Sequence, residues 1–257
     1  MSFPTDRTMI SLLNSASSLA GGMAVVTGAS SGIGRSIALA LSHQGMQLCL
    51  IGRDPIRLAE TVASAQQFSK VIDFQIDLAV DADLRPLLQH LEREAGGLDV
   101  LIHSAGEVHP GELERARIED LDHQYAINVR APYFVTKVLL PFLMKARGQI
   151  VFINSSVVLT TNRPGIGQYS ATKSALKAIA DSLRVEVNPK GIRVLTLYLG
   201  RTATPMQEAL FRQEGRVYQP QLLLQPEDVA SMVIHTLMLP STAEVTDITM
   251  RPMQKSY

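Results

Sequence analysis

Short apolar runs alternate with segments of helical period along most of the chain, and this alternation limits the folds that the sequence can adopt. A strand that is buried on both faces is a nearly continuous apolar run, whereas an amphipathic helix repeats its apolar residues every three or four positions. Repeated strand–helix units are typical of an α/β fold with a parallel sheet. The runs expected to be strands are residues 23–27, 47–51, 71–76, 98–103, 149–154, 193–199 and, at the end, 247–250.

The segments between these runs carry apolar residues at helical spacing. A long helical region is expected over 121–146, a second long helix contains Tyr169, and a further helix opens at Pro226, whereas 200–225 is less regular. Neither an internal repeat nor a linker divides the chain. We therefore predict an α/β fold of Rossmann type, a single doubly wound parallel sheet with helices on both faces. It would form one catalytic domain over 21–257, after a polar and mobile extension over 1–20.

The composition argues against several classes of function. Hydrophobic residues make up 46% of the 257 residues, which is enough for a core, and 24 basic residues balance 24 acidic ones. A balanced charge does not indicate a nucleic-acid partner or an anionic membrane surface. No apolar stretch approaches the ~20 residues of a membrane helix, and the N-terminus does not resemble a secretory signal. We expect a cytoplasmic protein, with its single cysteine, Cys49, buried.

A glycine-rich turn, VVTGASSGIGRS, stands where the first expected strand meets the first expected helix. Gly28, Gly32 and Gly34 would let the backbone turn sharply and approach a pyrophosphate, and a helix N-terminus offers free N–H groups and the positive end of its dipole. A tight turn without a ligand is the alternative interpretation. The position after the first strand of an alternating chain favours a nucleotide site.

The residues after the second strand indicate which nucleotide would bind. An acidic side chain there would suit a ribose 2′-hydroxyl, whereas an arginine would suit a 2′-phosphate. The sequence reads IGRDP, with Arg53 directly after Gly52, and Arg35 adds positive charge nearby. These residues favour NADP, while Asp54 keeps NAD open, and a solvated turn without a ligand is a third interpretation.

Taken together, the motifs resemble the short-chain dehydrogenase/reductase family over about residues 23–250. TGASSGIG (27–34) is similar to the family's cofactor loop, and Asp77-Leu78 to its adenine-flanking position. SAG (104–106) stands where the family usually has Asn-Ala-Gly. The resemblance implies that the cofactor is bound by Gly28, Ser30, Ser31, Gly32, Ile33, Gly34, Arg53, Asp77, Leu78, Ser104, Ala105, Gly106, Tyr169, Lys173, Gly200, Thr202 and Thr204.

Four further residues match the family's catalytic positions. INV supplies the helix asparagine as Asn128, YSATK supplies Tyr169 and Lys173, and the second serine of INSS, Ser156, lies at the family's distance from the tyrosine. The resemblance implies hydride transfer between a nicotinamide and a carbonyl or alcohol carbon, with Tyr169 as general acid/base and Ser156 holding the substrate oxygen. Lys173, on the same helix face, would lower the tyrosine's pKa and hold the nicotinamide ribose, and Asn128 would hold a water.

Two positions depart from the family pattern. Ser104 replaces the usual asparagine, so we expect altered local stability more than lost activity. Leu199 replaces the usual proline before Gly200, which affects the expected contact with the nicotinamide carboxamide, although Thr204 could still make it.

We therefore expect an NADP(H)-dependent oxidoreductase for a small-molecule carbonyl or alcohol. A nucleotide-sensing protein that does not turn over is the alternative. The segment 200–225 is the expected substrate lid, and its apolar residues and arginines suit an apolar substrate with an anionic group, or else its leucines pack in the core or between subunits. Family habit suggests a homotetramer or homodimer. The six histidines show no metal-ligand spacing, so we predict that the chemistry needs no metal.

Overall fold

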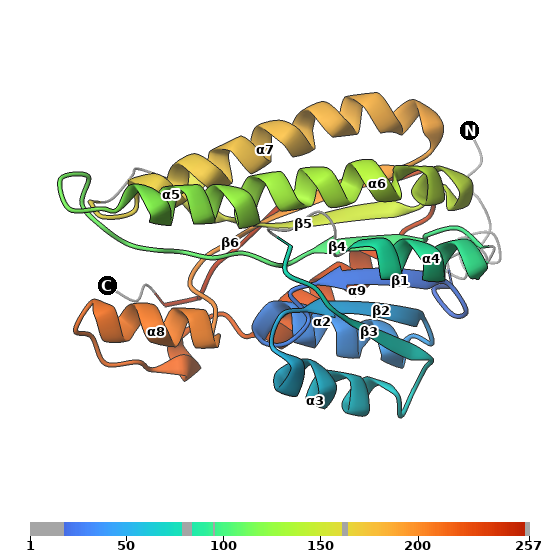
Figure 1. The fold of residues 1–257 in the computed structure, drawn as a ribbon, viewed down its shortest axis with the longest axis horizontal. Coiled ribbons are helices and arrows are strands. Elements are labelled where there is room, and N and C mark those ends of the chain that lie inside the picture. The colour runs from blue at the N-terminus through green and yellow to red at the C-terminus, as the bar shows by residue number, and fades with distance from the viewer. Residues whose placement is uncertain (1–17, 79–83, 95, 161–163, 255–257) are drawn as a thin grey trace, which may run out of the picture.

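The sheet confirms the predicted architecture. The computed structural model describes residues 18–78, 84–94, 96–160 and 164–254, and seven parallel strands in them form one sheet in the order β3-β2-β1-β4-β5-β6-β7 (Figure 1). Every expected strand is present, with ends shifted by at most two residues. The strands are β1 (Met23–Thr27), β2 (Gln47–Gly52), β3 (Val71–Gln75), β4 (Val100–His103), β5 (Gln149–Ser155), β6 (Arg193–Leu199) and β7 (Asp247–Met250).

Helices cover the sheet on both faces, as Figure 1 shows. One face packs against α2 (Gly32–His43), α3 (Pro55–Ala65) and α9 (Pro226–Leu237), and the other against α4 (Arg85–Arg93), α6 (Ala131–Ala146) and α7 (Gly167–Val187). Successive strand side chains point to opposite faces. In β1, Val26 therefore joins the first core while Val25 joins the second. Continuous apolar strands follow from this two-sided burial.

The order in which successive strands are added to the sheet changes direction at β1, because β2 and β3 lie on one side of it and β4 to β7 on the other. The neighbours of β1 are β2 on one side and β4 on the other, so the loops that leave these strands diverge. In doubly wound sheets such a switch point opens a crevice at the carboxyl ends of the strands, where ligands bind. The residues that follow β1, β2 and β4 therefore lie around one position.

The predicted long helical region consists of three parts. It begins with α5 (Ile118–Tyr125), widens into a π-helical turn over Ala126–Arg130 and continues as α6. A π-turn inserts one extra residue into the helical ladder, and such turns are frequent at functional sites. This turn contains Asn128, one of the four predicted catalytic residues.

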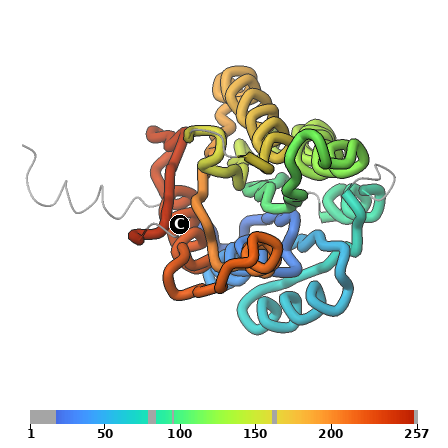
Figure 2. The backbone as a smooth tube through the Cα atoms, turned by 90° about the vertical axis from the view of Figure 1, so that its left-hand side faces the viewer, coloured from blue at the N-terminus to red at the C-terminus, as the bar shows by residue number. Residues whose placement is uncertain are grey.

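The segment 200–225 is more regular than its sequence suggested, because it contains α8 (Pro205–Gln213) and a short 3-10 turn at Pro220–Leu222. Thr204 caps α8 by accepting a hydrogen bond from the N–H of Gln207, and Pro205 occupies the first turn, where its missing N–H costs nothing. Figure 2 shows α8 in orange at the end of the molecule where the chain also leaves β4 in green.

The expected N-terminal extension lies almost wholly outside the described residues. Of its last three residues, Leu19 is buried in the core, so the packed part of the chain begins before the predicted boundary at residue 21. Across the described parts of the chain, no helix combines the length and the apolarity needed to cross a membrane.

Candidate active site

The glycine turn after β1 leaves no space for side chains. Gly28 has φ +68°, and a Cβ there would lie 2.7 Å from the backbone nitrogen of Ala105. A Cβ on Gly34 would lie 2.3 Å from the carbonyl oxygen of Gly28. Gly32, with φ +53°, packs against Thr204, which brings the segment before α8 onto the turn. Turn, β4 loop and α8 segment are therefore in close contact.

The N-terminus of α2 keeps its polar groups available. Ser31 occupies the N-cap position without a side-chain capping bond, and the first turn of α2 carries no acidic residue. Ser30 Oγ is buried and has no hydrogen-bond partner among the described residues, whereas Ile33 packs half-buried against the core. Free N–H groups at a helix N-terminus fit a bound phosphate. The residues present thus fit the pyrophosphate of a dinucleotide.

The turn after β2 separates the roles of Arg53 and Asp54. Asp54 caps α3, because its Oδ1 accepts hydrogen bonds from the N–H groups of Ile56 and Arg57 at 3.1 Å each. Its carboxylate is therefore already used within the chain. Arg53 is 65% exposed and forms an ion pair with Glu107, with 2.7 Å between Nη1 and Oε1.

Gly52, the last residue of β2, lies directly against Ser30. A Cβ on Gly52 would overlap Ser30 Oγ, so the serine side chain would have to turn away. The orphaned hydroxyl thus lies beside the residue that precedes Arg53. Asp77 and Leu78 follow β3, the first exposed and the second half-buried.

The turn after β4 is attached to β1 through Thr27. Its Oγ1 donates to the carbonyl oxygen of Ile102 and accepts from the N–H groups of Ser104 and Ala105, at 3.1 to 3.2 Å. This hydroxyl and the backbone of the turn therefore tie the central strands together at the position where Ser104 replaces the family's asparagine. A Cβ on Gly106 would lie 3.5 Å from Lys173 Nζ.

The Asn128 side chain holds the β4 loop. Its Oδ1 accepts from the N–H of Glu107, and its Nδ2 donates to the carbonyl oxygen of Glu107, both at 2.8 Å, and to Thr172 Oγ1 at 3.0 Å. These contacts occupy both ends of the amide, so the side chain links the loop, the π-turn and α7.

Ser155, rather than Ser156, lies at the Tyr169 hydroxyl. The Ser155 side chain hydrogen-bonds that hydroxyl and also accepts from the N–H of Val157 at 3.3 Å. Ser156 instead begins the 3-10 turn that follows β5. The count along the sequence pointed to Ser156, whereas the end of β5 brings its neighbour to the tyrosine.

Burial controls the ionisation of Tyr169 and Lys173. Removal of the Tyr169 hydroxyl from water raises its pKa, and the hydrogen bond from Ser155 opposes this rise. Burial lowers the pKa of Lys173 to about 8, because the ammonium loses hydration. Lys173 Nζ lies 5.9 Å from the centre of the Tyr169 ring and donates to the carbonyl oxygen of Ile153 at 3.2 Å. In the chain alone, the tyrosine pKa thus shifts opposite to the expected lowering.

The segment after β6 completes one wall. Gly200 donates its N–H to Met250 on β7 at 2.8 Å, and Thr202 is buried with its Oγ1 donating to the carbonyl oxygen of Gly200. Leu199 is buried as the last residue of β6, which remains paired up to that point. The family's proline is therefore replaced by a residue that continues the strand.

Glu107, His109 and His123 meet beside the β4 loop, a grouping that sequence spacing did not reveal. Glu107 Oε2 lies 2.8 Å from His123 Nε2 and 3.3 Å from His109 Nε2. The two histidines are separated by thirteen residues, and the first lies in a loop and the second in a helix, so no short motif marks them. Glu107 directly follows SAG in the sequence. An acidic residue beside this expected cofactor turn was the one sequence feature that could have indicated the grouping.

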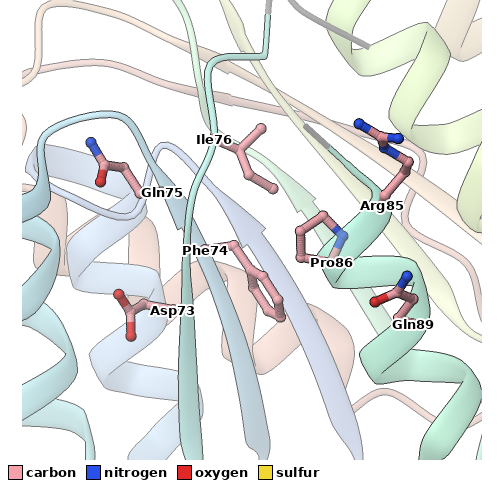
Figure 3. A pocket seen from close by; sticks show the side chains of 7 residues that line it. All are labelled: Asp73, Phe74, Gln75, Ile76, Arg85, Pro86 and Gln89. Carbon is pink, nitrogen blue, oxygen red and sulfur yellow. The ribbon is translucent and has the colours of Figure 1, made fainter. Parts of the chain in front are cut away.

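A pocket of about 570 Å³ lies away from these residues, at the β3 edge of the sheet. In Figure 3, Phe74 and Ile76 point toward Pro86 on α4, whereas Asp73 and Gln75 point to the other side of the strand. None of the predicted catalytic residues lines it. The pocket therefore belongs to the edge of the sheet and not to the candidate active site.

The chain belongs to the short-chain dehydrogenase family and is an oxidoreductase of that family. The family's sequence model, described as short chain dehydrogenase, matches residues 22–215. A Staphylococcus epidermidis protein described as an uncharacterized oxidoreductase is 31% identical over 232 residues, which cover 90% of this chain and 97% of the relative.

Solved structures with the same fold include two that contain NADP-type cofactors. An alcohol dehydrogenase from the archaeon Thermococcus sibiricus, complexed with 5-hydroxy-NADP, superposes with a TM-score of 0.82 at 25% identity, over 92% of this chain and 99% of that one. The closed form of a serine dehydrogenase complexed with NADP+ also gives 0.82, at 26% identity over 91% and 96% of the two chains.

Proposed function

We propose that this protein is an NADP(H)-dependent oxidoreductase that interconverts a carbonyl and an alcohol, with Tyr169 as the general acid/base. The observation that carries the proposal is the arrangement of Ser155, Tyr169 and Lys173, with Lys173 Nζ beside Gly106 in the turn after β4. A hydroxyl donor, a phenol and a buried amine at a dinucleotide-type crevice are the groups that such a reaction needs.

The preference for NADP is supported by the turn after β2. Arg53 presents an exposed guanidinium there, while the only neighbouring carboxylate of the turn, Asp54, is used as a helix cap. The orphaned hydroxyl of Ser30 lies against Gly52 and adds a second donor. A guanidinium and a hydroxyl suit a 2′-phosphate better than a ribose hydroxyl. The cofactors named in two similar structures agree with this choice.

Each residue of the proposed site has a separate task. When bound, the nicotinamide supplies or accepts the hydride. The raised pKa of Tyr169 keeps its phenol protonated at neutral pH, so it can donate a proton to the oxygen of a carbonyl being reduced. Ser155 would hydrogen-bond and orient the same oxygen. Lys173 would hold the ribose hydroxyls and, when charged, favour the phenolate that forms.

We infer that 200–225 covers the substrate, because Thr204 contacts the glycine turn. Several of its groups already have partners within the chain. Phe211 is buried, and Arg201 stacks on its ring and pairs with Glu214 at 2.8 Å. These contacts favour an apolar substrate over an anionic one. Assembly as a homodimer or homotetramer remains our prediction from the family.

Three variants test the proposed chemistry. Reduction of a panel of carbonyl compounds with NADPH should fall by roughly 10²–10⁴-fold in Tyr169→Phe, because the proton donor is lost, while NADPH binding persists. Ser155→Ala should lose most of its activity, and Ser156→Ala, its matched neighbour, should retain it.

Three results would contradict this account. Full activity of Tyr169→Phe would exclude the tyrosine as acid/base. A larger loss in Ser156→Ala than in Ser155→Ala would return the role to the residue that the sequence spacing indicated. NADPH binding without turnover in the wild type would favour a nucleotide-sensing protein.

A further inference from the structure

Glu107, His109 and His123 direct three donor atoms at one small volume. Their ligand atoms all lie within 4.8 Å of one another, and the two imidazole Nε2 atoms both face the same carboxylate oxygen, Oε2. The side chains are 16%, 40% and 43% exposed in the same order, so solvent and ions reach them. The trio lies outside the proposed catalytic set.

The backbone that carries these donors is held in place. Asn128 binds both the N–H and the carbonyl oxygen of Glu107, and Gln124 Oε1 accepts from the N–H of His109 at 3.1 Å. Gln124 is fully buried and directly follows His123 on α5. The loop and the helix that supply the three donors are thus fixed to each other, which makes the site preorganised.

The distances suit a first-row transition metal. With metal–ligand bonds of ~2.0–2.1 Å, tetrahedral ligand atoms lie about 3.3 Å apart. The distance from Glu107 Oε2 to His109 Nε2 is already 3.3 Å, that to His123 Nε2 is 2.8 Å, and the remaining distance is at most 4.8 Å. Shifts of at most about 1.5 Å would therefore create the site.

The donor types point to the same class of ion. Two imidazoles and one carboxylate suit Zn²⁺ and its neighbours, whereas Mg²⁺ and Ca²⁺ prefer oxygen ligands. Outer partners are also present, because Asp120 Oδ1 lies 3.9 Å from His109 Nδ1 and Arg53 contacts Glu107 Oε1. Carboxylates behind a ligating histidine orient its ring. We propose that Glu107, His109 and His123 form a Zn²⁺-type metal site with one position left for solvent.

The ion would not act on the reacting atoms, so the prediction that the chemistry needs no metal is unchanged. It would instead act on Arg53. A metal at Oε2 takes up charge of the Glu107 carboxylate and weakens the ion pair made by Oε1, which releases the guanidinium. This consequence rests on the proposed function, because it assigns Arg53 to the 2′-phosphate.

Calorimetric titration of Zn²⁺ into the full chain, purified without a histidine tag, tests the site. The wild type should bind one equivalent. His109→Ala and His123→Ala should each weaken binding by more than the ~10–100-fold that loss of an outer partner costs, and Asp120→Asn should weaken it within that range. His235→Ala, which removes an exposed histidine on α9, is the matched control and should bind as the wild type does.

The result that overturns the site is either absent Zn²⁺ binding by the wild type or equal binding by His109→Ala, His123→Ala and the wild type. Circular dichroism of each variant shows that a loss is not caused by unfolding. Both histidine side chains are partly exposed and belong to neither core cluster, so folded variants are expected.

Nucleotide titrations with and without Zn²⁺ test the consequence for Arg53. Saturating Zn²⁺ should raise NADPH affinity several-fold and leave NADH affinity unchanged, and NADPH should tighten Zn²⁺ binding by the same factor. Unchanged NADPH affinity in a chain that binds Zn²⁺ would overturn the coupling. This outcome is distinct from failure of the proposed function, in which NADPH would not bind at all.

Discussion

Burial favours the neutral forms of both Tyr169 and Lys173. A buried phenol resists deprotonation, and a buried amine resists protonation. With its pKa lowered to about 8, the lysine is still mostly charged at neutral pH in the cofactor-free chain, but it loses its proton more readily than an exposed lysine does. The phenolate becomes accessible only when another charge or hydrogen bond compensates, and Ser155 supplies one such bond.

The lowered pKa of Lys173 predicts a pH-dependent stability. Between pH 8 and 10.5 the unfolded chain binds the lysine proton while the folded chain does not, so the free energy of unfolding should rise with pH in this window. The full difference corresponds to roughly 3 kcal/mol. Relative to Lys173→Met, the wild type should therefore gain stability as the pH rises from 8 to 10.5.

Denaturant unfolding of both chains without cofactor measures this difference. Parallel stability curves of the wild type and Lys173→Met across the window would show that the lysine titrates normally in the folded chain. Because the comparison uses differences between pH values, the packing change caused by methionine cancels.

Among these residues, the sequence predicted that Tyr169 and Lys173 lie close together, but it did not indicate that Ser155 hydrogen-bonds the tyrosine. Positions i and i+4 share one helix face whatever surrounds them, so the pair follows from local geometry. The serine depends on where β5 ends and how the chain turns into the segment before α7. Ser155 is the last residue of the strand, and a count of residues across the turn does not show this.

At the scale of elements, the strands were predictable because burial on both faces imposes continuous apolar runs. The sequence pattern does not predict the helix α8, because its apolar face is short and Phe211 is its only buried residue. The start of the helix is marked only by Thr204 as the N-cap and Pro205 in the first turn. The π-turn at Asn128 was also invisible, since one inserted residue barely changes a helical pattern. Both misses lie beside the candidate site.

Close packing of the glycine turn predicts a specific cost at Gly34. Gly34→Ala would place a Cβ 2.3 Å from the Gly28 carbonyl oxygen, so the turn must move. We expect a loss of about 1–3 kcal/mol in the free energy of unfolding and weaker NADPH binding. Gly167→Ala, at an open position in the first turn of α7, is the control and should gain about 0.4–1 kcal/mol. Equal urea midpoints for the two variants would contradict this packing account.

At the scale of the whole molecule, the sheet order brings together residues that are distant in sequence. The turns after β2 and β4 approach each other across β1, which allows Arg53 to reach Glu107 at 2.7 Å. The sequence predicted both turns as cofactor contacts but could not show this ion pair, because it depends on side-chain placement across the crevice. The same holds for the Glu107, His109 and His123 site.

The ion pair also means that a 2′-phosphate must compete with a carboxylate for Arg53. A charge-assisted hydrogen bond contributes about 1.5–3 kcal/mol, which corresponds to roughly 10–100-fold in affinity. The preference for NADPH over NADH should therefore be measurable but moderate, and should depend mainly on the Arg53 side chain.

The most direct test of the proposed function is a titration of the wild type, Arg53→Ala and Arg57→Ala with NADPH and NADH. Arg57 is the matched control, because it lies four residues further along in the first turn of α3 and pairs with Asp54. We predict tighter NADPH than NADH binding by the wild type and Arg57→Ala, and no preference in Arg53→Ala. An unchanged preference in Arg53→Ala would contradict the role of Arg53, and absence of binding to either nucleotide would contradict the proposed cofactor altogether.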